Sequence, residues 1–285
     1  MYTFIGIIAG SICVILGFIM ADGEVMILVQ PAEYLIIFGS TLGIFLSSNG
    51  MKVMQQTMQQ MKGLLKPELT KQHYLDVLKM MYELFSIARK EGLLGLESHV
   101  EHPEESEIFK NYPTFLANHH AVCFFTDTMK VILTGAVGPH DLSEMMEVDL
   151  ETTNEEEVQP GESVQNVADA LPAIGIVAAV LGIIITMGKI GGSASAIGHA
   201  VAAALVGTFL GVFLAYVVAG PLGRALLQRV RLNGQYMKCL SHALFSFARG
   251  ESPITCIEFA RRNIDPSVRP GFTELEQTVK GKKPA

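Results

Sequence analysis

The chain has 285 residues, of which 49% are hydrophobic and only 17% are charged, and its mean hydropathy is +0.36. This balance favours a membrane protein over an ordinary soluble one. The formal net charge is −7, and the basic residues are dispersed and lack interleaved aromatic side chains, which argues against a nucleic-acid-binding protein.

Four stretches of the sequence are nearly free of charge, and each is long enough to cross a bilayer as a helix. They are Tyr2 to Met20, Ala32 to Asn49, Leu171 to Met187 and Ile197 to Gly220. About 17 to 25 helical residues match the hydrocarbon core, which is roughly 30 Å thick. Buried helices of a large soluble protein explain such long, recurring stretches less well. We do not expect a cleaved signal peptide in the first stretch, because no basic region precedes Tyr2.

The distribution of Lys and Arg near the span ends predicts the orientation, because positive residues are retained on the cytoplasmic side. The link from Ala21 to Pro31 has no basic residue, and the link after the third span has only Lys189. Basic residues instead follow the second and fourth spans: Lys52, Lys62, Lys66, Arg224, Arg229 and Arg231. We therefore expect both termini in the cytoplasm.

These features predict four parts of the chain. A transmembrane hairpin, residues 1–49, is followed by a cytoplasmic domain, 50–168, a second transmembrane hairpin, 169–221, and a cytoplasmic tail, 222–285. The cytoplasmic domain has a formal charge of −10 and the tail one of +6. A basic tail can contact anionic lipid headgroups, the acidic domain, or both.

The residues outside the spans favour helices, because apolar side chains recur at three- and four-residue spacings. The predicted helices are Val53 to Leu65, His73 to Lys90, Asn118 to Ile132, His140 to Asn154, a continuation of span four through about Phe247, and Ile254 to Arg262. We expect breaks at 135–139 and 155–161 and no regular structure over 265–285. Since no segment alternates as a strand does, the predicted fold class is all-α.

Motifs for catalysis or for cofactor and metal binding are not found. The sequence has no phosphate-binding glycine loop and no His-Glu-x-x-His helix. Its four cysteines share no close spacing, which argues against a metal site. The pairs His99 with His102 and His119 with His120 lie in polar sequence without a third ligand, so we interpret them as surface residues. We therefore predict a protein that is not an enzyme and has no cofactor.

The spans carry no ionisable residue near their centres. Glu33 and His199 lie at predicted outer edges, and Asp169 lies at an inner edge. His199 is explained equally simply as an interfacial residue. Because proteins that move ions usually hold ionisable groups inside their spans, a chain of this kind needs a carboxylate from another chain. Thr208 lies deep in span four, where a lone threonine often bonds to its own helix instead of lining a path.

Small residues and prolines mark the spans. Glycines four residues apart allow close approach of helices, within the chain or between chains; they are Gly6 and Gly10, Gly39 and Gly43, and Gly207 and Gly211. Pro172 and Pro221 lie at matching inner ends of spans three and four. Each proline either kinks the helix, as a hinge would, or simply ends it.

Several motifs in one order carry a family resemblance. Leu171 to Gly182, Val206 to Gly211 and Pro221 resemble the MotA family of flagellar motor stator subunits, part of the MotA/TolQ/ExbB proton channel family. Three further segments are similar to that family: Gln30 to Glu33, Glu104 to Phe109 with Tyr112 and Pro113, and Arg269 to Glu276. The resemblance covers nearly the whole chain.

The resemblance implies a torque-generating ion channel in the bacterial inner membrane. In that family, five such chains surround two copies of MotB, whose single span supplies an ion-binding aspartate and whose outer domain binds peptidoglycan. The cytoplasmic charges engage the rotor protein FliG. By motif position, Arg89 and Glu97 match the rotor-facing pair; without the family they are ordinary surface charges.

The resemblance also implies roles for residues of the spans. Pro172 and Pro221 match the coupling prolines, and Thr208 matches a channel threonine. Sodium-driven relatives have a threonine where this chain has Ala179, and alanine has no hydroxyl to coordinate sodium. The resemblance therefore implies a proton-driven motor.

Two other classes are weighed against this interpretation. Transport energisers such as ExbB or TolQ share the span pair but have three spans, whereas four are predicted here. A membrane enzyme would need a cluster of acid, base or nucleophile, and none is found.

Overall fold

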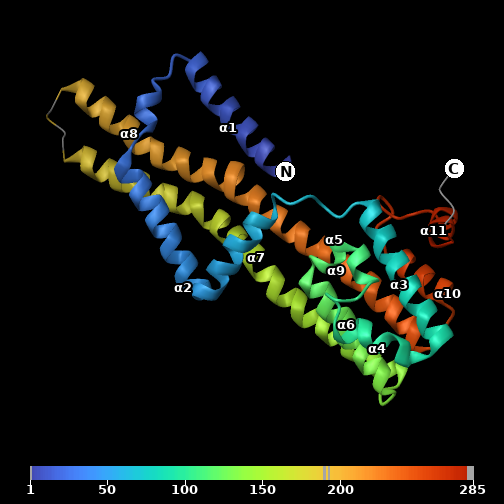
Figure 1. Ribbon diagram of the computed structural model, residues 1–285. Helices are drawn as coiled ribbons and strands as arrows, with labels where there is room; N and C mark the ends of the chain where they lie inside the picture. The colour runs from blue at the N-terminus through green and yellow to red at the C-terminus, as the bar shows by residue number, and fades with distance from the viewer. Residues whose placement is uncertain (1, 189–190, 192, 281–285) are drawn as a thin grey trace. The chain divides into compact units, whose positions relative to one another are not determined.

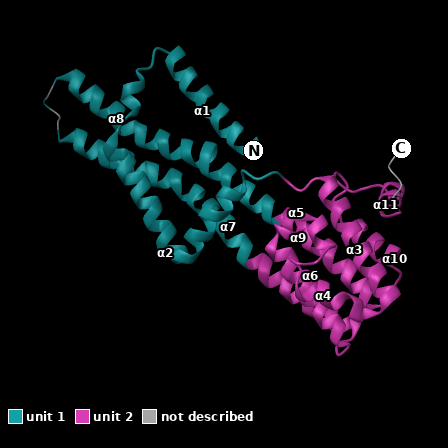
Figure 2. Cartoon of the chain, in the orientation of Figure 1, with its two compact units in different colours: residues 1–67, 156–230 teal, residues 68–155, 231–285 magenta. Residues whose placement is uncertain are grey.

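The computed structural model describes residues 2–188, 191 and 193–280, and within these residues the chain is helical and contains no strand. Figure 1 shows the succession of helices. The chain divides into two compact units, coloured separately in Figure 2: residues 1–67 with 156–230, and residues 68–155 with 231–285. The predicted all-α class is confirmed.

The first unit contains the membrane-spanning helices. Its elements are α1 (Tyr2–Met20), the short η1 (Val25–Leu28), α2 (Pro31–Gly63), the second half of α7 (Pro139–Met187), α8 (Ala194–Phe213), the π-helix η4 (Leu214–Ala219) and the first part of α9 (Gly220–Ala248). Four of its helical segments are long and apolar enough to cross a membrane. The four predicted spans are therefore confirmed. The predicted outward link after span three, with Lys189, lies partly outside the described residues.

The spans bury few side chains within the chain itself. No residue of α1 is buried, and large apolar side chains along α1, α2 and the second half of α7 are exposed. The small core of the unit consists of Ile37, Leu171, Ala178 and Ala215. Helices with so much apolar surface are suited to contact with lipid or with other chains.

Helix α2 changes direction at Gly50, which has φ 70° and ψ −177°. A positive φ is readily adopted only by glycine. The kink lies directly after the predicted end of span two at Asn49. The sequence from Met51 onward then continues as the polar helix that the spacing over Val53 to Leu65 predicts.

The second unit is a helical domain with a conventional core. Its elements are α3 (Lys71–Glu91), η2 (Leu93–Leu96), α4 (Glu97–Glu101), η3 (Phe109–Asn111), α5 (Pro113–Leu116), α6 (His119–Thr134), the first part of α7, the second part of α9, α10 (Pro253–Arg262) and α11 (Phe272–Val279). Phe85 and Phe247 stack at 4.4 Å between ring centroids, and Phe109, Phe115 and Phe125 form a second aromatic group. Each fully buried side chain of this size contributes about 1.5 to 3 kcal/mol.

Two predictions of local structure are wrong. Residues 155–161 do not form a break, because α7 continues through them and contains Pro160. The Gln60 side chain donates to the Glu157 carbonyl, and Gly161 leaves room for Leu227 on α9, whose side chain would lie 2.8 Å from a Cβ at that position. Residues 265–285 also contain structure, since α11 forms there, starts with a Glu274 bond to the Gly271 amide and buries Leu275.

The compact units and the predicted four parts divide the chain by different criteria. The predicted boundaries near 50, 168 and 222 mark where the chain enters and leaves a bilayer. Helices α7 and α9 run without interruption past 168 and 222, and α2 continues past 50 across the kink at Gly50. A membrane helix that extends into the cytoplasm needs no break at the bilayer surface, so the boundaries stay a prediction.

Candidate functional site

Helices α7 and α8 touch through their backbones. A Cβ added to Gly211 would lie 2.7 Å from the Leu171 carbonyl oxygen and 2.8 Å from the α-carbon of Gly175. A Cβ on Gly175 would lie 2.8 Å from the Gly207 carbonyl oxygen. The pair Gly207 and Gly211, four residues apart in α8, thus brings the two helices together as small residues do in membranes. The other predicted pairs differ, because Gly6, Gly39 and Gly43 have no neighbour within 4 Å of an added Cβ.

Both residues predicted for the ion path lie at this contact. Ala179 of α7 is only 5% exposed, and its backbone nitrogen would lie 3.1 Å from a Cβ on Gly207. Thr208 follows Gly207 in α8 and is half-buried. The structure therefore brings Ala179 and Thr208 to the same level of the α7–α8 hairpin.

The hydroxyls of the two span threonines behave differently. Thr186 is buried and donates to the Gly182 carbonyl oxygen at 2.8 Å, one turn back along its own helix. No described residue forms a hydrogen bond with the Thr208 hydroxyl. The alternative of a bond to its own helix therefore applies to Thr186 and not to Thr208.

The carboxyl group of Glu33 lies next to glycines of two other helices. Glu33 is the third residue of α2 and is only 7% exposed. Its Oε2 atom would lie 2.5 Å from a Cβ on Gly207, and its Oε1 atom 3.4 Å from one on Gly182. Gly207 is near the middle of the predicted span Ile197 to Gly220. Glu33 therefore lies in the first turn of its own span, while its carboxyl group lies beside α8, next to which α2 begins (Figure 1).

Sequence reasoning missed this contact because it placed each span separately. A register between helices depends on where each helix begins, and hydropathy does not show this. The usable signal was the combination of one carboxyl at the start of α2 with glycines at 182 and 207, where a long side chain from another helix can fit.

The two predicted coupling prolines have different surroundings. Pro172 lies inside α7, which continues to Met187, so plain helix termination at Pro172 is wrong. Pro221 is the second residue of α9, which directly follows η4. Because proline lacks the N–H that would bond to the Val217 carbonyl, the wider π-helical turn before it has a physical cause. Pro221 also lines a cleft of about 520 Å³ with Thr3, Tyr216 and Arg224.

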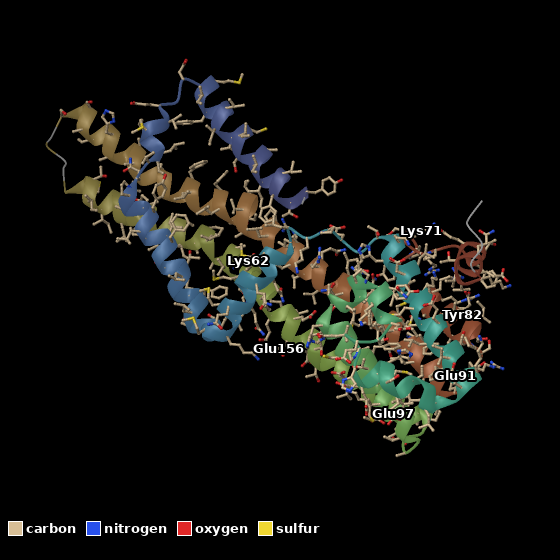
Figure 3. The ribbon with its side chains drawn as sticks, in the orientation of Figure 1. Lys62, Lys71, Tyr82, Glu91, Glu97 and Glu156 are labelled. Carbon is tan, nitrogen blue, oxygen red and sulfur yellow. The ribbon has the colours of Figure 1, made fainter. Side chains whose placement is uncertain are left out.

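The predicted rotor-facing residues lie in the second unit. Arg89 belongs to the last turn of α3, and Glu97 begins α4 after the short turn that starts at Gly92, which has φ 81°. Both side chains are exposed, and neither pairs with a charged residue in the described part of the chain. The labels Glu91 and Glu97 in Figure 3 mark the end of α3 and the start of α4. The fold therefore presents a positive and a negative charge close together in sequence and open to a partner.

The histidine candidates lie beside different neighbours in the second unit. Nδ1 of His99 bonds with the Ser106 hydroxyl at 2.8 Å, and His119 lies beside Cys123 with 3.4 Å between Nδ1 and Sγ. Among the residues that the structure describes, no group of three potential ligands is present. His199 is exposed.

Comparison with known proteins gives full-length relatives. The chain is 36% identical over 278 residues to the chemotaxis protein LafT of Vibrio parahaemolyticus, covering 97% of this chain and 98% of the relative. It is also 36% identical over 268 residues to motility protein A of Escherichia coli, covering 94% of this chain and 91% of that protein. Residues 4–92 match the pattern described as the motility protein A N-terminal region, and residues 117–238 match that of the MotA/TolQ/ExbB proton channel family. The chain belongs to the MotA family.

The fold agrees with solved structures of that family. The C. jejuni MotAB structure superimposes with a TM-score of 0.77, 20% identity and coverage of 93% of this chain and 96% of its counterpart. The Bacillus subtilis MotAB stator complex gives a TM-score of 0.72 with 23% identity, covering 90% of this chain and 92% of its counterpart. This MotA-family chain is thus a membrane protein and a subunit of a flagellar stator of the proton channel class.

Proposed function

We propose that this chain and a MotB-type single-span subunit together form a proton channel that converts ion flow into torque on the flagellar rotor. The observation that carries the proposal is the full-length similarity to motility protein A, at 36% identity. The two structural relatives are complexes with MotB. The chain acts as a channel subunit and not as an enzyme, and its place is the bacterial inner membrane.

The partner is required because the spans supply few ionisable groups. Among the described residues, Glu33 is the only Asp or Glu inside the predicted spans. Asp169 lies at the inner edge of span three. We infer that a MotB-type aspartate carries the proton past the wall formed by Ala179 and Thr208. Five copies of this chain around two partner chains would surround that aspartate, and the exposed apolar surfaces of α1 and α2 would be buried against lipid and neighbouring copies.

The second unit is the part that we infer acts on the rotor protein FliG. Exposed charges steer association and fix the register of two surfaces more than they add affinity. Arg89 and Glu97 are exposed and of opposite sign, as such a contact requires. Both termini and the acidic domain then belong in the cytoplasm, in agreement with the basic residues after spans two and four.

Coupling between the channel and the rotor contact is proposed to pass through Pro172 and Pro221. Each proline removes one backbone hydrogen bond from a long helix, so that bending costs less there than elsewhere. The π-helix before Pro221 adds a second irregularity to the same helix. Helices α7 and α9 both continue from the spans into the second unit, so bending at either proline moves residues of that unit.

Gene deletion and complementation test the proposal. A strain without this gene should assemble flagella that do not rotate, and the gene on a plasmid should restore rotation. The membrane-extracted chain should co-purify with a single-span partner that has an aspartate in its span. Loss of siderophore uptake with normal rotation would indicate a transport energiser of the ExbB or TolQ type and would contradict the proposal.

A further inference from the structure

One buried carboxyl group has no role in the mechanism described so far. Glu33 is 7% exposed, and its Oε2 atom has no hydrogen-bond partner among the described residues. No described Lys, Arg or His forms an ion pair with it. Ionisable residues inside membrane segments are rare and expensive, and they usually mark a path for ions.

The carboxyl lies at the proposed ion path itself. It occupies space left by two glycines, because Oε2 would lie 2.5 Å from a Cβ on Gly207 and Oε1 3.4 Å from a Cβ on Gly182. The same Cβ on Gly207 would lie 3.1 Å from the Ala179 nitrogen. Thr208, whose hydroxyl is unbonded, is the next residue of α8. Three helices thus place a carboxyl, an alanine and a free hydroxyl at one level.

A purely structural role explains this arrangement poorly. A glutamate in the first turn favours a helix N-terminus through the helix dipole, but this effect is also available to an exposed side chain. The start of α2 is not closed by a side-chain cap, and the Gln30 amide bonds to the Ile27 carbonyl instead. Burying an unpaired carboxyl is costly, so its burial against α7 and α8 calls for another explanation.

The surroundings suit a group that gains and loses a proton. The carboxyl lies against Gly182 of α7 and Gly207 of α8, which offer no charge or side-chain hydrogen bond, and such apolar surroundings favour the neutral acid. The amide groups at the start of α2 favour the anion. Neither form is held by a fixed counter-charge from a described residue, as a transfer site requires.

We propose that Glu33 is a second proton-binding group of the channel, supplied by this chain in addition to the partner's carboxylate. The neutral acid releases its proton to the next acceptor along the path and becomes a carboxylate. It then takes a proton from the side at which protons enter. This inference rests on the proposed function.

Rotation of single motors at two loads tests the inference. A cell with a small bead on its flagellum rotates fast, so proton transfer limits its speed, whereas a large bead slows rotation until transfer no longer limits it. In a strain without the native gene, Glu33→Gln should lower the low-load speed by at least about tenfold, which is less than the roughly 10²- to 10⁴-fold that a proton-transfer group contributes to a rate, because the partner's carboxylate remains. The high-load torque of each engaged stator complex should stay near that obtained with the parent chain.

The matched control is Glu24→Gln, which changes an exposed carboxylate in the link before α2. It should leave both speeds unchanged. Equal low-load speeds for Glu33→Gln and the parent would overturn the inference while the proposed function stood. If the parent gene does not restore rotation at all, the proposed function itself fails. A loss of torque at both the low and the high load would indicate a structural role for Glu33 and would also overturn the inference.

A second measurement covers a variant that fails to assemble. The hydrophobic carbodiimide DCCD modifies protonated carboxyls in apolar surroundings, and mass spectrometry locates the modified residue. In the parent complex, Glu33 should be modified in step with the loss of low-load rotation, and Glu24 should not be. Absence of the reagent from Glu33 in complexes whose partner aspartate is modified would contradict the inference.

Discussion

The α-carbons of Gly175 and Gly211 face each other without room for a side chain, because a Cβ on Gly211 would lie 2.8 Å from the Gly175 α-carbon. The nearby Leu171 carbonyl oxygen would lie 2.7 Å from the same Cβ. These neighbours are backbone atoms, which cannot move aside as a flexible side chain can. The contact fixes the spacing of α7 and α8, and with it the close approach of Gly207 to Ala179.

Replacing Gly211 with alanine should separate the two helices. Overpacking costs about 1 to 3 kcal/mol, whereas a glycine that meets no neighbour gains up to about 1 kcal/mol as alanine in a helix. Gly211→Ala should therefore lower the unfolding temperature of the purified chain and reduce rotation. Gly43→Ala, where an added Cβ has no neighbour within 4 Å, should not lower it. Equal shifts for the two variants would show that the α7–α8 contact is not tight.

The tail holds a compact ion pair whose strength depends on pH. The Arg261 guanidinium donates to both oxygens of Glu258 at 2.7 and 2.8 Å, and its third nitrogen donates to the Pro270 carbonyl. The hydrogen bond from Arg261 lowers the pKa of Glu258 below its ordinary value of 4.5. The side chains of Arg261 and Glu258 are only 13% and 19% exposed. This pair is therefore less screened by solvent than a typical surface pair.

Glu258→Gln should lower the free energy of unfolding by about 1 kcal/mol at neutral pH. Because the folded state has the lower pKa, the contribution of the carboxylate is complete above about pH 4.5 and is lost as the pH falls through the folded-state value. The difference between parent and variant, measured by urea unfolding, should shrink in that acidic range. Asp127→Asn removes the exposed pair with Lys130 and should have little effect at any pH. A difference that grew on acidification would contradict the assignment.

The sequence predicts the spans and most helices because their signals are local. Runs of apolar residues identify the spans, and the three- and four-residue spacing of Leu75, Leu78, Met81 and Phe85 identifies α3. The prediction of a break at 155–161 is based on Pro160 and Gly161, which are local signals for a turn, and it is wrong. In the fold, Gly161 instead admits Leu227 and Gln60 bonds to the Glu157 carbonyl. These contacts join residues far apart in the sequence.

The candidate site was predictable only in part. Ala179 and Thr208 followed from motif position, and the structure brings them together through Gly207. The Glu33 carboxyl could not be placed, because its depth depends on where α2 begins relative to α8. A hydropathy pattern assigns residues to spans but does not give the register between one span and the next.

The free hydroxyl of Thr208 should matter more to rotation than the bonded hydroxyl of Thr186. Thr208→Val keeps the shape of the side chain and removes a group that can assist a passing proton. It should slow low-load rotation several-fold, whereas Thr186→Val removes only a bond to its own helix. Bead assays of the two variants give the comparison. An equal effect of both would indicate that packing, and not the Thr208 hydroxyl, is responsible.

Ala179 should make rotation independent of sodium. Its methyl group cannot coordinate a partly dehydrated cation, and its backbone lies against Gly207. Swimming speed should stay constant across sodium concentrations when the membrane potential and the pH difference are held fixed. A strict sodium requirement would refute proton drive, although the assignment to the MotA family would stand.

Arg89 and Glu97 should be needed for torque and not for folding. Both are exposed and without a charged partner in the described chain, and surface substitutions of this kind usually change stability by less than about 0.5 kcal/mol. Replacing both with alanine should leave the amount of the chain in membranes and its unfolding temperature unchanged. It should lower the high-load torque of each engaged stator complex. Lys90→Ala changes an exposed charge next to Arg89 and is the matched control, which should retain torque. Loss of complementary charge should weaken the salt-sensitive binding of the rotor protein FliG to the detergent-purified complex. If the double variant and the Lys90→Ala control bind FliG equally well, the assigned rotor contact is wrong.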